Sequence, residues 1–397
     1  MKNFLKLVIL GVMLSSFGKV MYAQGESAVP FLLLAPDSRA GGLGESGSGL
    51  ADNSAAIFWN PAGIAFLTGT EMSFTHSNWL PQLNLDDLFY EFLTFRHYME
   101  ELNGSITASI TYMNFGEFIR TNDFGDEIGT FRSFDGALTV GYATKIHNDW
   151  GLGANFRLIH SSLSDKPTAE EKGDGKATTV SFDIATMWRP EELDLPLIGD
   201  MSNRLSIGVN LSNLGPKITY IDEDQADPLP TNFRLGIAAR VFEDDYNSLT
   251  FTADFSKLLV TRVDTNGLGR KVTSDDKDPF YKAIFTAWGD QSFDQELRDI
   301  TTALGLEYWY GTPGEFQFAV RSGFFYEDPS YGNRKFVTFG AGIRYEMYGF
   351  DFSYITTDVF KDGEEHPLSD TVRFTLSMAW GNNGSQGRTQ RGFPRGI

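Results

Sequence analysis

The 397-residue chain contains no cysteine. This absence excludes disulfide scaffolds, thiolate metal sites and a cysteine nucleophile. Basic residues are also scarce, because 33 Lys and Arg face 52 Asp and Glu and give a net charge of −19. A nucleic-acid partner requires a basic footprint, so we expect none. After the first residues, no stretch reaches the ~18 apolar residues of a membrane-spanning helix.

The start of the chain has a composition of its own. Lys2 and Lys6 provide positive charge, an apolar stretch continues to Leu14, and Met21-Tyr22-Ala23 ends in a small residue. This order is typical of a secretory signal. We therefore predict a signal peptide over residues 1–23 and an exported mature chain.

Period-two patterns dominate the remainder. From Thr371 to Trp380, apolar residues at even positions alternate with polar or small residues at odd positions. Side chains alternate between the two faces of a strand, so each such run has one apolar face. Fourteen runs of this kind are present, at 71–79, 87–97, 105–112, 135–146, 150–162, 178–188, 205–212, 232–241, 249–256, 301–310, 315–322, 335–345, 347–356 and 371–380.

Two architectures use many half-apolar strands. A soluble sandwich or barrel turns the apolar faces inward, whereas an outer-membrane barrel turns them toward lipid. The even count, the run length of about ten residues and the aromatics at run ends favour the membrane barrel. These aromatics are Trp79, Trp150, Trp188, Tyr310, Tyr348 and Trp380.

The connections between runs support the same choice. Short links alternate with long ones, as in barrels with short periplasmic turns and long outer loops. The long links are expected near 113–134, 163–177, 213–231, 257–299 and 357–370, and the link at 189–203 is long where a short turn is expected. We predict an all-β fold, a 14-stranded antiparallel transmembrane β-barrel over residues 71–380.

Two further segments complete the predicted organisation. Residues 24–70 combine glycines and small residues with the turn-forming Asn60-Pro61, which indicates a compact plug in the barrel. Residues 381–397 contain three Arg and no acid, which indicates a flexible basic tail. Charges of both signs fall on the predicted inward face and should pair across a filled lumen; they are Asp183, Asp254, Glu307, Asp351, Arg234, Arg240, Arg321 and Arg373.

Several motifs resemble a known family. Arg39-Ala40 before a run of glycines, Ala51-Asp52-Asn53-Ser54-Ala55 and Asn60-Pro61-Ala62-Gly63 resemble the N-terminal signature of FadL-like outer-membrane barrels. The resemblance implies fourteen strands, an N-terminal plug and the outer membrane of a Gram-negative bacterium. The residues that carry this plug motif are Arg39, Asp52, Asn60, Pro61, Ala62 and Gly63.

Within that family, stretches 211–218, 229–230 and 254–260 resemble the PorV-type subunits of the type IX protein secretion system. The resemblance implies a protein that takes cargo with a C-terminal β-domain from a giant outer-membrane translocon subunit. It also implies delivery to a surface attachment complex that contains a sortase-like cysteine protease, and contact with outer-membrane lipid. The alternative is a FadL-like channel for hydrophobic small molecules.

The longest link, 257–299, is the candidate partner- or cargo-binding loop. Phe280, Ile284 and Trp288 have helical spacing, with Tyr281 and Phe285 beside them. The parity of the strand count places this loop outside the cell. Its apolar stripe either docks a partner or cargo, or covers the chain's own barrel.

Catalytic patterns are weak, so we expect no enzyme activity, metal or cofactor. The five His form no close ligand pair. His160 and Ser161 are adjacent on a predicted strand and therefore point to opposite faces. Gly42, Gly44 and Gly47 match a dinucleotide fingerprint but lack its βαβ context.

Overall fold

The computed structural model describes residues 27–83, 87–122, 124–164, 175–196, 199–262, 273–312, 314–357 and 367–381. The predicted signal peptide over 1–23 lies outside these ranges, as does the predicted tail beyond residue 381.

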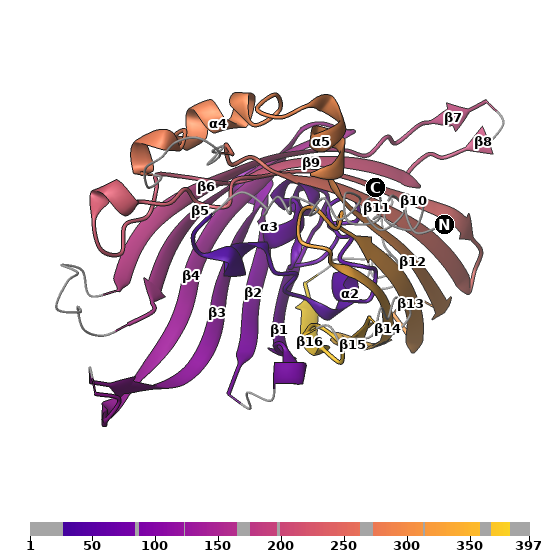
Figure 1. The fold of residues 1–397 in the computed structure, drawn as a ribbon. Helices are drawn as coiled ribbons and strands as arrows, with labels where there is room; N and C mark the ends of the chain where they lie inside the picture. The colour runs from indigo at the N-terminus through magenta and orange to yellow at the C-terminus, as the bar shows by residue number, and fades with distance from the viewer. Residues whose placement is uncertain are drawn as a thin grey trace, which may run out of the picture.

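Fourteen antiparallel strands close into a barrel, in which β1 pairs with β16 and each other strand pairs with its neighbours along the chain (Figure 1). This is the predicted architecture. The barrel strands are β1 Thr70–Asn78, β2 Phe89–Met99, β3 Gly104–Thr121, β4 Glu127–His147, β5 Trp150–Ser162, β6 Lys176–Trp188, β9 Leu205–Leu214, β10 Asn232–Glu243, β11 Asn247–Leu258, β12 Thr301–Gly311, β13 Gln317–Tyr326, β14 Lys335–Tyr345, β15 Tyr348–Thr356 and β16 Val372–Trp380.

The wall has its apolar side chains on the outside. In β1, Met72 and Phe74 are 40% and 41% exposed, whereas Ser73 and Thr75, which alternate with them, are buried. A soluble barrel would show the reverse, because its apolar residues must leave water. Lipid is as apolar as these side chains, so the outward apolar face is that of a transmembrane barrel.

Long and short connections fall at opposite ends of the barrel. At the short-turn end, β4 and β5 are joined by residues 148–149 and β14 and β15 by 346–347. The link at 189–204 is on this end and contains the small hairpin of β7 (Asp194–Leu195) and β8 (Gly199–Asp200). At the long-loop end, residues 259–300 form the longest connection.

The prediction of a long loop near 113–134 is wrong. There β3 continues to Thr121 and β4 begins at Glu127, so a hairpin extends beyond the rest of the wall. Side chains beyond the bilayer face water on both sides, and the apolar alternation that marks membrane strands stops there. The turn between these strands is only residues 122–126.

Residues 27–69, here the N-terminal segment, fold inside the barrel (Figure 1). Large apolar side chains of this segment, such as Phe31, Ile57 and Trp59, are buried together with Tyr90 and Phe92 of β2. Its helices are η1 Pro30–Leu33, α2 Ser38–Gly41, α3 Ala56–Trp59 and η2 Pro61–Phe66. The predicted boundaries of the plug and barrel domains stay a prediction.

The remaining helices lie in the connections. They are η3 Pro81–Leu83, η4 Glu100–Leu102, η5 Glu223–Gln225, η6 Ser274–Asp276, α4 Phe280–Thr286 and α5 Phe293–Arg298. Within the described ranges, every helix is too short or too polar to span a membrane.

Candidate functional site

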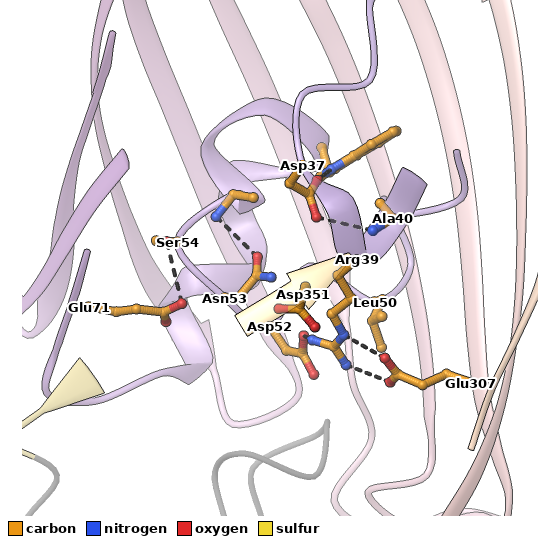
Figure 2. Close-up of polar contacts among 12 residues, drawn as sticks. Asp37, Arg39, Ala40, Leu50, Asp52, Asn53, Ser54, Glu71, Glu307 and Asp351 are labelled. Atoms are coloured by element: carbon orange, nitrogen blue, oxygen red, sulfur yellow. Dashed lines mark hydrogen bonds and ion pairs between the residues drawn. The ribbon is translucent and has the colours of Figure 1, made fainter. Parts of the chain in front are cut away.

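Arg39 joins the N-terminal segment to the barrel wall (Figure 2). It lies in α2, which Asp37 caps by accepting a hydrogen bond from the Ala40 amide at 3.0 Å. The Arg39 guanidinium donates to Asp52 at 2.5 Å and, through Nε and Nη2, to Glu307 of β12 at 2.7 Å each. Such two-pronged pairing fixes orientation as well as charge. The motif residues Arg39 and Asp52 therefore lie together.

The charge pairs continue along the wall. Arg321 of β13 donates to Glu307 at 2.7 Å and to Asp351 of β15 at 2.8 Å. Asp351 also accepts from Arg344 at 2.6 Å. Charges of alternating sign thus neutralise one another in the lumen, where an unpaired charge would be costly. The prediction that lumen charges pair is confirmed for these strands.

The Asn60-Pro61-Ala62-Gly63 motif forms a tight turn against the wall. The Asn60 side chain accepts a hydrogen bond from the Ala62 amide at 3.0 Å and donates to the Thr186 carbonyl of β6 at 3.1 Å. Pro61 occupies the first turn of η2, where its missing N–H costs nothing. A Cβ on Gly63 would lie 2.1 Å from the Ala51 carbonyl oxygen, so only glycine fits. These residues hold the segment in place.

Three cavities beside the N-terminal segment are small. Two lumen cavities, one lined by Trp59 and Arg234 and one by Arg39 and Trp309, each hold about 50 Å³. A third, between Ile57 and Phe92, holds about 10 Å³. Small-molecule pockets usually measure roughly 300–1,000 Å³. These cavities hold a few waters at most.

Within the connection 259–300, residues 273–300 fold against the outer side of the barrel rim. Lys257 of β11 lies on the same outward face as Phe255, yet it is buried, because α5 covers it. Its ammonium lies 2.8 Å from Glu296 and 2.7 Å from Asp299. Trp288 packs edge-on against Phe233, the residue opposite Lys257 on β10, with ring centroids 5.4 Å apart.

The structure separates the predicted stripe into two faces. Phe280 and Ile284 are half-buried and line the same side of α4 as the buried Ala283 and Ala287. Tyr281, Phe285 and Trp288 are 64%, 75% and 44% exposed. Helix α4 ends at Thr286, so Trp288 follows the helix instead of lying within it. Trp288 packs on the chain's own barrel through Phe233, whereas Tyr281 and Phe285 are largely exposed.

Two exposed apolar residues were missed by sequence reasoning. Phe293 and Leu297 lie one turn apart in α5 and are 79% and 54% exposed. A local signal was present, since Ser292 and Gln295 form the capping box that starts α5. We call Tyr281, Phe285, Trp288, Phe293 and Leu297 the aromatic rim face.

The pair considered for catalysis is split as predicted. His160 points outward and contacts Phe134 and Thr178. Ser161 is fully buried on the inward face, where it accepts a hydrogen bond from the Tyr220 hydroxyl at 2.9 Å. His160 therefore cannot take the Ser161 proton.

A known protein family matches more than half of this chain. The family model for the type IX secretion system protein PorV matches residues 23–265. No curated protein matches the chain. Similar solved structures are the toluene transporter TodX of P. putida (10% identity, 87% of this chain and 99% of that chain, TM-score 0.48) and the toluene transporter TbuX of Ralstonia pickettii (11%, 86% and 97%, 0.47). A FadL homologue of Pseudomonas aeruginosa has 13% identity, covers 87% and 98%, and has a TM-score of 0.45.

The closed wall with apolar residues outward and paired charges inward defines an outer-membrane β-barrel of a Gram-negative bacterium. The chain belongs to the PorV family of type IX secretion system proteins. It is thus an outer-membrane component of that secretion system and associates with other components of it. The family match ends at residue 265, before α4, so a role for the aromatic rim face rests on the geometry of this chain.

Proposed function

We propose that this protein is a non-enzymatic carrier in type IX secretion. It receives cargo that bears a C-terminal β-domain from the giant translocon subunit and delivers the cargo to the sortase-like surface attachment complex. Membership of the PorV family supports this role. Its mechanism is binding and release, without covalent chemistry.

The aromatic rim face is the observation that carries the proposal. Monomeric proteins rarely leave a cluster of large apolar side chains in water unless a partner covers it. Tyr281 and Phe285 are one helical turn apart on α4, so a partner can cover both rings at once. Covering a ring of this size contributes ~1–3 kcal/mol, and aromatic residues are the usual anchors of interfaces.

The position of this face suits a surface carrier. It belongs to the long-loop end, which in bacterial barrels faces outward from the cell. The ion pairs of Lys257 with Glu296 and Asp299 hold α5 against the rim. The face is therefore preformed, which lowers the entropy cost of binding.

The lumen gives little support to the alternative, a channel for hydrophobic small molecules. Such a channel needs an apolar path beside the N-terminal segment. The cavities beside Trp59 and Trp309 hold about 50 Å³ each and are lined by charged residues. Binding at the outer rim uses surface that is already exposed.

Affinity purification from native outer membranes, followed by mass spectrometry, tests the proposal. We expect the giant translocon subunit and proteins with a C-terminal β-domain to copurify. The double variant Tyr281→Ser/Phe285→Ser should lose cargo about tenfold or more, which corresponds to ~1.4 kcal/mol. Phe124→Ser, at another exposed aromatic of the long-loop end, is the matched control. Recovery of bound fatty acid or hydrocarbon with no secretion partner would instead establish the channel.

A further inference from the structure

A hollow of about 440 Å³ lies in the outer wall, over the seam where β1 pairs with β16. Two neighbouring rows of outward side chains cross the strands there. In one row Leu376 lies between Phe350 and Phe74. In the next, Met378 lies between Tyr348 and Met72. Aliphatic side chains and aromatic rings together line the hollow.

The surroundings of the hollow determine what fills it. Its lining is continuous with the lipid-facing wall, since Phe74, Phe350 and Leu376 are outward residues with 41%, 39% and 60% exposure. Between apolar groups in a bilayer, close packing rather than the hydrophobic effect decides association. If the hollow were empty, the side chains that line it would lose dispersion contacts. A flexible hydrocarbon chain restores these contacts, and the two methionines can adapt to it.

The ends of the hollow indicate how such a chain would be oriented. Tyr345 and Tyr348 flank the two-residue turn 346–347 at the short-turn end and are 55% and 58% exposed. Tyrosines at this level place their rings in hydrocarbon and their hydroxyls at the headgroups. The short-turn end of bacterial barrels faces the periplasm, and the periplasmic leaflet of the outer membrane consists of phospholipid.

We propose that this hollow is a binding site for one acyl chain of a periplasmic-leaflet phospholipid. The chain lies over Leu376 and Met378, and the headgroup meets the hydroxyls of Tyr345 and Tyr348. The site is independent of cargo binding at the aromatic rim face, which is at the other end of the barrel.

Photolabelling of the full chain in phosphatidylethanolamine and phosphatidylglycerol vesicles tests the site. A small fraction of the phospholipid carries a diazirine in its acyl chain, and mass spectrometry locates the adducts. We expect adducts on Met72, Leu376 and Met378 to exceed those on Leu306, an outward residue of β12, about fivefold, which corresponds to ~1 kcal/mol. Equal labelling around the wall would overturn the proposal.

Filling the hollow provides a second test. Leu376→Trp should reduce labelling of Met72 and Met378 to the level of the general wall, whereas Leu306→Trp should not. Heat-modifiable migration on gels checks that both variants fold, and Leu376→Phe replaces the first if it does not. Unchanged labelling in the folded variant would also contradict the site.

An experiment in native outer membranes distinguishes a lipid in the hollow from a protein in the hollow. Metabolic incorporation of a diazirine analogue of methionine places the photoreactive group at Met72 and Met378 without filling the hollow. We expect phospholipid adducts at these positions. Crosslinks to another polypeptide would show that the hollow is a protein interface and would overturn the lipid assignment.

Discussion

Replacing Arg39 by methionine removes the charge that joins the N-terminal segment to the wall while retaining an apolar stem. Three hydrogen bonds are lost, one to Asp52 at 2.5 Å and two to Glu307 at 2.7 Å. Glu307 keeps Arg321 at 2.7 Å, but Asp52 is buried and its Oδ2 already lacks a hydrogen-bond partner in the described part of the chain. Removing one member of a buried ion pair costs ~3–5 kcal/mol, and we expect a loss of unfolding free energy in this range.

Urea unfolding in phospholipid vesicles, followed by tryptophan fluorescence, measures this loss. Arg132→Met is the matched control, because Arg132 is 80% exposed and lies 3.8 Å from Glu117; it should cost at most ~1 kcal/mol. Adding Glu307→Gln to Arg39→Met should cost less than Glu307→Gln alone, with a coupling energy of ~0.5–3 kcal/mol. A loss no larger than the control, or no coupling, would refute the assignment of Arg39 as the link to the wall.

Three further predictions follow from single contacts. Gly63→Ala should lower the unfolding free energy by ~1–3 kcal/mol, because the added methyl group would clash with Ala51. Gly289→Ala is the control and should leave the unfolding free energy unchanged, because a Cβ at residue 289 meets nothing within 4 Å. Equal effects of the two variants in urea unfolding would contradict the close packing of Gly63 on Ala51. Lys257→Met should free α5 and speed proteolysis within residues 273–300, whereas Arg132→Met, at an 80% exposed side chain on β4, should not; equal cleavage rates would contradict the anchoring role of Lys257. Burial alone would raise the pKa of Asp278, but hydrogen bonds from Lys282 and Thr286 lower it below its usual value. The support that Asp278 gives to α4 is therefore present above the ordinary carboxylate pKa and is lost as pH falls through the lowered value. As pH falls through the lowered pKa of Asp278, hydrogen exchange of the α4 amides should accelerate in the wild type but not in Asp278→Asn.

The sequence predicts the barrel well because lipid imposes a strict rule on its wall. Each spanning strand needs an apolar residue at every second position, and all fourteen runs carry that pattern. The rule no longer applies beyond the bilayer, so the sequence predicts a long link near 113–134 where β3 in fact continues to Thr121. The apolar residues of this hairpin, such as the stacked pair Phe118 and Phe131, follow no regular alternation that would reveal its strands.

The candidate site is less accessible to sequence reasoning. Arg39 and Glu307 are 268 residues apart, and no local pattern connects them. The helical spacing of Phe280 and Ile284 indicated a helix, but not which face would be covered. Which face is covered depends on Phe233 and Lys257, which point outward at the rim. Phe233 contacts Trp288, and Lys257 pairs with Asp299 at the end of α5, so both hold this connection against the wall.

The absence of cysteine makes one measurement decisive for the role of the aromatic rim face. Phe285→Cys introduces a single thiol, and its reaction with a membrane-impermeant maleimide is followed on intact cells. Phe124→Cys at the long-loop end and Tyr246→Cys at the short-turn end are the controls. We expect rapid labelling at residues 285 and 124 but not 246, and protection of residue 285 alone when cargo is being secreted. Labelling at residue 285 only after permeabilisation, or labelling unaffected by cargo, would contradict the account.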